Sequence, residues 1–141
     1  MAAKAHADWK GDLQTGSGEF VAGESIKGHV TFKSRFEDGE GANPEQLIAA
    51  AHASCFSMAL SAGLAEAGTP VDLVETDATV SLQMVDGAPT ITKIALKVVG
   101  KVPGIDQATF EAAAAGAKAN CPVSKALASV PEITLDATLA A

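Results

Sequence analysis

The sequence predicts one domain of the α+β class, in which antiparallel sheets pack around a long central helix. Its 141 residues are 48% hydrophobic, which is enough for a single buried core. Segments with the period-two alternation of strands flank an apolar stretch, residues 46–65, that has no formally charged residue. No repeat, linker or low-complexity tract divides the chain, so we expect a single domain over 1–141.

Composition also narrows the range of partners. The formal net charge of -7 opposes binding to a phosphate backbone or to an anionic membrane as the main function. The N-terminus shows no apolar run followed by a cleavage site, which predicts a cytoplasmic protein. The uncharged stretch is dense in Ala and Ser and contains His52 and Gly63, so we interpret it as a buried helix rather than a membrane span.

Residues 6–35 carry three short aromatic and β-branched runs, around Trp9, Phe20 to Val21 and Val30 to Phe32. Gly-rich breaks separate these runs, as expected for antiparallel strands joined by tight turns. Continuing the alternation of the third run places Arg35 on the polar face at the end of that strand.

The central helix is predicted to begin at Asn43 and Pro44, which suit the N-cap and the first helical position. Gly68, Thr69 and Pro70 should end it. Several apolar side chains recur at helical spacing and predict a core-facing stripe. These residues are Leu47, Ile48, Ala51, Cys55, Met58 and Ala62.

The second half of the chain returns to strand patterns. Residues 71–101 alternate apolar and polar side chains around an Asp86-Gly87 turn, which predicts a long hairpin. Asp106 can cap an Ala-rich helix over about 107–118, and Cys121-Pro122 restarts a short one. Alternation over 133–139 predicts a final strand.

Two cysteines in a reducing compartment are either inert buried thiols or one working pair. A zinc site is poorly supported, because no His or carboxylate stands at ligand spacing from them. An isolated Cys55 on an apolar helix face would be almost wholly protonated, and a nearby guanidinium would favour its thiolate. Cys121 precedes Pro122 at a helix start, so the residues alone nominate Cys121 as the more acidic thiol.

The run from Gly41 to Leu60 resembles the central helix of the OsmC/Ohr family of osmotically induced and organic-hydroperoxide-resistance proteins. Three later runs, 91–96, 102–105 and 120–124, agree with the family in the same order. The resemblance covers nearly the whole chain and is closer to the OsmC branch than to the Ohr branch. It implies an OsmC-like fold and an intertwined homodimer.

The resemblance also implies a chemistry, a thiol peroxidase that reduces organic hydroperoxides to alcohols. By that match Cys55 is the attacking thiol and Cys121 the resolving thiol, and Arg35 and Glu45 are the charged pair beside the attacking one. An external dithiol, of the lipoyl type by resemblance, would reduce the resulting disulfide, and no metal, haem or flavin is required. Apolar side chains beside Cys55 can form a pocket for the alkyl group of the peroxide, namely Leu47, Ile48 and Met58.

Spacing adds a prediction about assembly. Glu45 and Cys55 are ten residues apart, which along a continuous helix corresponds to about 15 Å. Glu45 therefore cannot reach the Cys55 of its own chain. If both serve one site, Glu45 must come from a second subunit whose helix packs antiparallel, and Arg35 should accompany it.

Two other functions remain open at this point. His52 lies three residues before Cys55, which suggests a cysteine hydrolase, but no third group to orient the imidazole is evident and a hydrogen-bonded structural role is commoner. The other alternative is a non-enzymatic stress protein that binds a hydrophobic ligand in the same pocket while its cysteines are merely packed.

Overall fold

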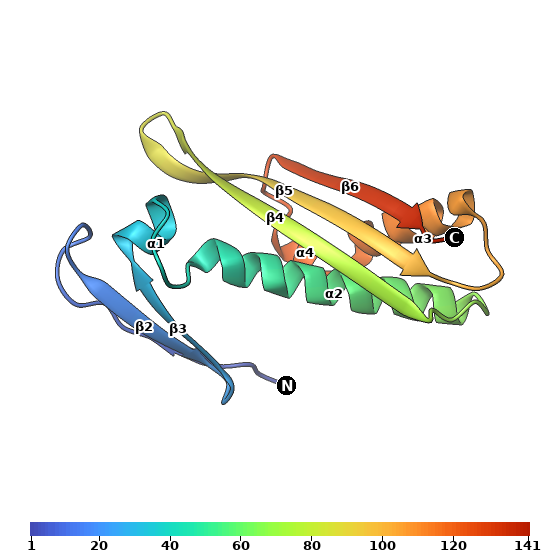
Figure 1. The fold of residues 1–141 in the computed structure, drawn as a ribbon, viewed down its shortest axis with the longest axis horizontal. Coiled ribbons are helices and arrows are strands. Elements are labelled where there is room, and N and C mark those ends of the chain that lie inside the picture. The colour runs from blue at the N-terminus through green and yellow to red at the C-terminus, as the bar shows by residue number, and fades with distance from the viewer. The chain divides into compact units, whose positions relative to one another are not determined.

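The computed structural model describes residues 1–141, which form two compact units, residues 1–47 and residues 48–141 (Figure 1). Each unit has its own sheet of three strands. Helix α2, Pro44–Glu66, begins in the first unit and continues through the second. The single domain over 1–141 stays a prediction, because the contacts within the chain gather in these two units.

The first unit contains an antiparallel sheet with the strand order β1-β2-β3. Its strands are β1, Ala5–Ala7, β2, Ser17–Ala22, and β3, Ile26–Thr31. The predicted runs at Phe20 and Val30 are therefore strands. Trp9 lies beyond the end of β1 and is 40% exposed, so it is not a core residue of the chain.

The prediction that Arg35 ends a strand is wrong, because β3 stops at Thr31 and a short helix, α1, covers Phe32–Phe36. Thr31 Oγ1 accepts a hydrogen bond of 3.0 Å from Ser34 N, and Ser34 Oγ accepts one of 2.9 Å from Thr31 N. This reciprocal capping box satisfies the backbone locally, so the strand need not continue. Arg35 thus extends from a helix.

Both predicted ends of α2 are confirmed. Asn43 Oδ1 accepts a hydrogen bond of 2.9 Å from Gln46 N, and Pro44 is the first helical residue. At the other end Gly68 has φ of 84°, and Thr69 N donates to Leu64 O at 2.9 Å. This is a Schellman ending, which needs the left-handed conformation that glycine adopts without strain.

The predicted core stripe of α2 is wrong for most of its members: Ile48 and Cys55 pack partly buried against the core, but Met58 is 73% exposed and Leu47 37% exposed. The buried residues of this helix are Glu45, His52, Phe56, Leu60 and Leu64. Apolar side chains occur on every side of α2, so the sequence periodicity does not indicate which side of the helix is buried. By length and composition alone α2 is also long and apolar enough to cross a membrane. The core helices of soluble proteins meet the same two criteria.

The second unit contains the predicted hairpin of β4, Leu73–Val85, and β5, Ala88–Lys101. Asp86 and Gly87 turn it with φ of 51° and 80°, as a type I′ turn requires. The predicted last strand is β6, Glu132–Leu139. It pairs with β5 in parallel, which corrects the expectation of purely antiparallel sheets, because the chain returns through a helical crossover.

The core of the second unit lies between α2, β5 and α3, Gln107–Asn120. Asp106 caps α3 as predicted, accepting a hydrogen bond of 2.8 Å from Thr109 N. A short helix, α4, follows over Pro122–Ala126. The fully buried side chains of this core are Phe56, Leu60, Ile94, Leu96, Val98, Phe110, Ala114 and Cys121.

Gly100 in β5 should be essential for this packing. A Cβ at this position would overlap the ring of Phe110, which is itself fully buried. We expect Gly100→Ala to lower the free energy of unfolding by about 1 to 3 kcal/mol, measured by denaturant titration. Gly116→Ala in α3 is the matched control, since its Cβ would meet no atom within 4 Å and should stabilise by up to about 1 kcal/mol. Equal stability of both variants would contradict this account.

Candidate active site: a thiol pair and an Arg–Glu pair

The second unit brings together two cysteines that are 66 residues apart in the sequence. The sulfur atoms of Cys55 and Cys121 are 2.9 Å apart, and both residues are free thiols. Cys121 is fully buried and Cys55 is half-buried. A disulfide bond is about 2.05 Å long, so a shift of roughly 1 Å would join the two sulfurs.

The backbone of Cys121 is held on both sides. Its N–H donates to Ala117 O at 2.8 Å, which closes α3, and its carbonyl accepts from Lys125 N at 3.1 Å, which opens α4. Pro122 is the first residue of α4, a position where its missing N–H costs nothing. Cys121 is thus positioned by two helix ends, while Cys55 is carried on the long helix α2.

The two thiols differ in acidity. Burial raises the pKa of the Cys55 thiol, and its hydrogen bond with Cys121 raises that pKa further. Burial also acts to raise the pKa of Cys121, but its interactions with Cys55 and with Ser124 outweigh burial and lower that pKa. Within the chain, Cys121 is therefore the more acidic thiol, as the sequence alone suggested.

His52 occupies a buried position on α2, one turn before Phe56. Its Nε2 lies 2.7 Å from Ser124 Oγ, and its Nδ1 has no hydrogen-bond partner. Burial lowers the pKa of the imidazole, which favours the neutral form. The histidine is thus buried and hydrogen-bonded, as the structural interpretation expects. The hydrolase interpretation loses support, because no group orients the ring through Nδ1.

The first unit carries the predicted charged pair. Arg35 Nη2 lies 2.8 Å from Glu45 Oε1, and Arg35 Nε lies 3.2 Å from the same oxygen. The Glu45 side chain is only 9% exposed, whereas that of Arg35 is 34% exposed. The guanidinium carbon also lies 5.4 Å from the centre of the Phe36 ring. The buried carboxylate and this ring together hold the cation in one orientation.

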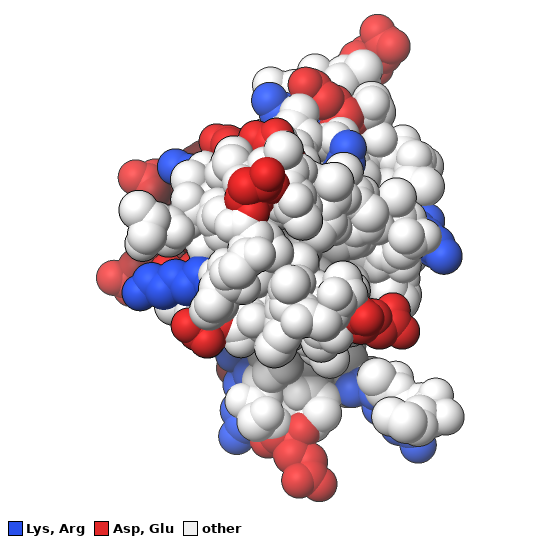
Figure 2. Space-filling model, turned by 90° about the vertical axis from the view of Figure 1, so that its right-hand side faces the viewer, with Lys and Arg blue, Asp and Glu red and all other residues white.

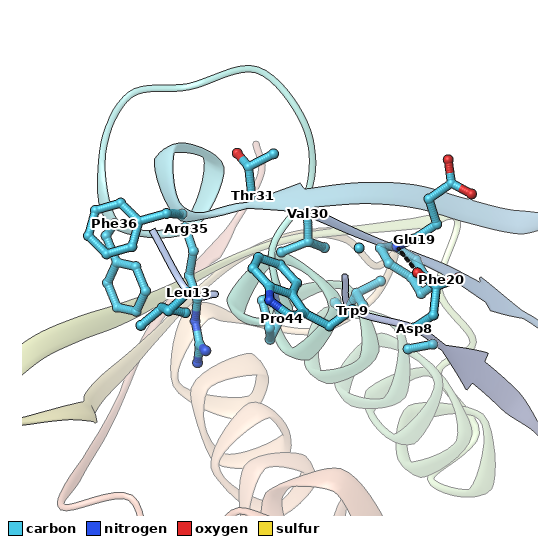
Figure 3. Close-up of a pocket in the computed structure, with 14 residues that line it drawn as sticks. Asp8, Trp9, Leu13, Glu19, Phe20, Val30, Thr31, Arg35, Phe36 and Pro44 are labelled. Atoms are coloured by element: carbon cyan, nitrogen blue, oxygen red, sulfur yellow. Dashed lines mark hydrogen bonds between the residues drawn. The ribbon is translucent and has the colours of Figure 1, made fainter. Parts of the chain in front are cut away.

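Arg35 also lines a cavity of about 310 Å³ in the first unit. Figure 3 shows its guanidinium at the end of a side chain that runs from α1 past Leu13. Most of the lining is aromatic or aliphatic, and it includes Trp9, Leu13, Phe20, Val30, Phe32, Phe36, Pro44 and Leu47. The arrangement, an apolar cavity with one cation at its wall, suits a ligand with an alkyl or aryl body and a polar end.

The seven predicted site residues therefore fall into separate sets. Arg35, Glu45 and Leu47 belong to the first unit, and Cys55 and Cys121 form the sulfur pair of the second. Ile48 packs against the core cluster of the second unit, whereas Met58 is exposed. The sequence interpretation missed the contact of Ser124 with His52. The position of Ser124, three residues after Cys121, was the only available signal.

Two further features are the distribution of charged side chains on the surface and the placement of side chains that could ligate a metal ion. Figure 2 shows a face that is mostly uncharged, on which the Lys and Arg side chains do not merge into one continuous area. No group of three or more His, Cys, Asp or Glu side chains is placed to hold a metal ion.

The fold and the paired sulfurs define a class: an α+β protein with two thiols close enough to cycle between dithiol and disulfide. The family model described as OsmC-like protein matches residues 37–136. The chain belongs to the OsmC family, and the predicted resemblance and fold class are confirmed.

Comparison with curated proteins and solved structures agrees with this assignment. The chain is 49% identical to the peroxiredoxin OsmC of Escherichia coli over 135 residues, 94% of this chain and 93% of that one. It is 34% identical to an organic hydroperoxide resistance protein of Xanthomonas axonopodis, over 69% of this chain and 67% of the relative. The crystal structure of the organic hydroperoxide resistance protein OhrB of Bacillus subtilis superposes with a TM-score of 0.73 at 25% identity, covering 99% and 98% of the two chains.

Proposed function

We propose that the chain is a cytoplasmic thiol peroxidase that reduces organic hydroperoxides to alcohols through Cys55 and Cys121. The observation that carries the proposal is the 2.9 Å separation of the two sulfurs. The names of the curated relatives, a peroxiredoxin and an organic hydroperoxide resistance protein, support a role of the peroxidase type. No cofactor is needed, because sulfur itself is the redox group.

Only the last step of the proposed cycle needs a reactant other than the protein and the hydroperoxide. The Cys55 thiolate attacks one peroxide oxygen, the O–O bond breaks, and the alkoxide leaves as an alcohol after taking up a proton. Cys55 is then a sulfenic acid, and Cys121 attacks its sulfur to form a disulfide while water leaves. An external dithiol returns both cysteines to thiols, and the family resemblance points to a lipoyl-type dithiol.

The raised pKa of Cys55 means that its thiol needs a cation to become the attacking group. Arg35 is the proposed cation, with Glu45 fixing its orientation. Glu45 and Cys55 lie on one uninterrupted helix, ten residues or about 15 Å apart. We therefore propose that each site is shared between two subunits of a homodimer, with Arg35 and Glu45 of one chain serving Cys55 of the other.

The exposed apolar side of α2 supports a homodimer. Met58 and Leu47 project from a helix whose opposite side, at Phe56 and Leu60, is already buried in the chain. A helix that is apolar all round is normally covered on every side. Association along this side would make residues 1–141 one intertwined OsmC-like domain, and it would bury the stripe predicted from the sequence.

The alkyl group of the substrate is proposed to bind in the apolar cavity of the first unit. Leu47 already lines this cavity beside Arg35, and Ile48 and Met58 would complete it in the assembled dimer. An aromatic and aliphatic lining favours bulky organic hydroperoxides over hydrogen peroxide, because burying an apolar body contributes about 25 cal/mol per Å².

Adding one equivalent of cumene hydroperoxide to the reduced protein tests the function. We expect the intact mass to fall by about two protons as the disulfide forms, with cumyl alcohol released in equal amount. Cumyl alcohol itself is the matched control, since it fills the same cavity but has no O–O bond. An unchanged mass with either compound, together with saturable binding of both, would support the non-enzymatic binding protein instead.

A further inference from the structure

The outer edge of β6 is a surface that the proposed mechanism does not use. The strand order is β4-β5-β6, so β6 pairs with β5 on one side only (Figure 1). Just after the strand, Ala140 N donates to Gly100 O in β5, which indicates that even-numbered residues direct their backbone groups toward β5. Because these groups alternate along a strand, those of the odd-numbered residues of β6 point away from the sheet. Such an edge can pair with a further strand.

The side chain of Gln107 already occupies one end of this edge. Its Nε2 donates to Ala137 O at 2.9 Å, and its Oε1 accepts from Leu139 N at 2.8 Å. A side-chain amide thus makes the two hydrogen bonds that a peptide group of an added strand would make. Toward the start of β6, the outward N–H and carbonyl groups of Leu135 and Ile133 have no hydrogen-bond partner within the chain.

A groove, called here the edge groove, runs beside these unpaired groups, between β6 and the helices α3 and α4. It consists of two adjoining cavities of about 560 Å³ and about 350 Å³, which share Lys118 and Ala119 in their lining. Leu135 and Ala137 line the larger cavity, and Ile133 lines the smaller one. Neither cysteine lines the edge groove, so it is separate from the thiol pair.

The charges of the edge groove differ between its two ends. The smaller cavity is lined by Lys118 and Lys125 and by no acidic residue. The two carboxylates of the groove, Glu111 and Asp136, line only the larger cavity, at the end that Gln107 closes. Neither lysine forms an ion pair within the chain. A chain with a net charge of -7 thus places two unpaired cations beside open backbone groups, which favours an acidic partner.

We propose that the edge groove is a docking site for an extended, acidic peptide segment of another protein. The segment adds to β6 as a strand and hydrogen-bonds to the outward groups of Ile133 and Leu135, so that its main chain supplies affinity and its side chains supply specificity. The free edge takes about five residues, or about 17 Å of extended chain. Acidic residues at alternate positions would all face the helices, where Lys118 and Lys125 lie.

Solution NMR with a probe peptide tests the backbone pairing. The probe is a capped pentapeptide in which Thr and Glu alternate, and the matched control has the same side chains but an N-methylated backbone that cannot pair with an edge strand. We expect the probe, and not the control, to shift the amide signals of Ile133 and Leu135 and to slow hydrogen exchange at Leu135. The absence of a saturable shift at these amides would overturn the proposal. So would a Leu135 amide that is protected before any peptide is added, because a second copy of the chain would then occupy the edge.

Removing the two lysines tests the charge complementarity. Lys118→Ala combined with Lys125→Ala should raise the Kd of the probe about fivefold at low salt, since each partly exposed ion pair contributes modestly. Lys4→Ala combined with Lys101→Ala removes the same charge outside the groove and should leave the Kd unchanged. Equal weakening in both double variants would contradict the proposal, because attraction by net charge alone would explain it. No peroxide enters these measurements, so their outcome is independent of the proposed peroxidase function.

Discussion

Cys55→Ser is expected to abolish peroxide reduction, whereas Cys121→Ser should still reduce one equivalent and then stop. A serine hydroxyl is not appreciably ionised at neutral pH, so the loss at Cys55 should reach about three orders of magnitude or more. In Cys121→Ser the Cys55 sulfur can still be oxidised, but no second thiol is within reach to displace the hydroxyl group. Stopped-flow measurement of cumene hydroperoxide consumption, with dimedone trapping of the sulfenic acid, distinguishes the two variants.

Each cysteine variant is a control for the other, because both cysteines pack in the same core and their thiols differ in acidity. The pKa of Cys121 is lowered and that of Cys55 is raised within the chain. If the roles followed this difference alone, Cys121 would be the attacking thiol. Peroxide consumption that survives Cys55→Ser and disappears in Cys121→Ser would therefore reverse the proposed assignment.

Mixing two inactive variants should restore about a quarter of the activity if each site is shared between subunits. One variant combines Arg35→Met with Glu45→Gln, and the other is Cys55→Ser. Each homodimer lacks a required group, but a mixed dimer has one complete site made from the Arg35 and Glu45 of one chain and the Cys55 of the other. Random exchange makes about half of the dimers mixed, each with one of its two sites intact.

Replacing Arg35 and Glu45 together is necessary for this experiment. The Glu45 side chain is 9% exposed and its one strong partner is Arg35, so removing the arginine alone would leave a buried carboxylate unpaired. Such a change typically costs about 3 to 5 kcal/mol and could unfold the chain. Activity is followed with a dithiol in excess after subunit exchange and size-exclusion chromatography. No recovery in a mixed dimer would refute the shared site.

Local features of this chain were predicted correctly because they depend on hydrogen bonds between near neighbours. The caps at Asn43 and Asp106 join residues three apart, and the turn at Asp86-Gly87 depends on two residues with positive φ. The family resemblance supplied the pairing of Cys55 with Cys121, which the 2.9 Å separation now supports. Neither inference required knowledge of how distant segments pack.

Each of the incorrect predictions also has a physical reason. The start of α1 was missed because Thr31 and Ser34 form a capping box where the β-branched pattern of β3 suggested a longer strand. The buried side of α2 was misassigned because apolar side chains surround the helix, so only its neighbours decide which side is covered. The parallel pairing of β6 depends on the crossover through α3, which alternation within a strand does not encode.

By itself, then, the sequence determined the ends of α2, the cap of α3, the Asp86-Gly87 turn, the strand periodicity of the second unit and the family to which the chain belongs. Tertiary structure alone decided that Ser124 faces His52 across 72 residues of sequence, which side of α2 is buried, and that β6 pairs with β5 in parallel. The reason is that the energy of a cap or turn comes from atoms a few bonds apart, whereas the meeting of distant side chains is decided by how the whole core packs.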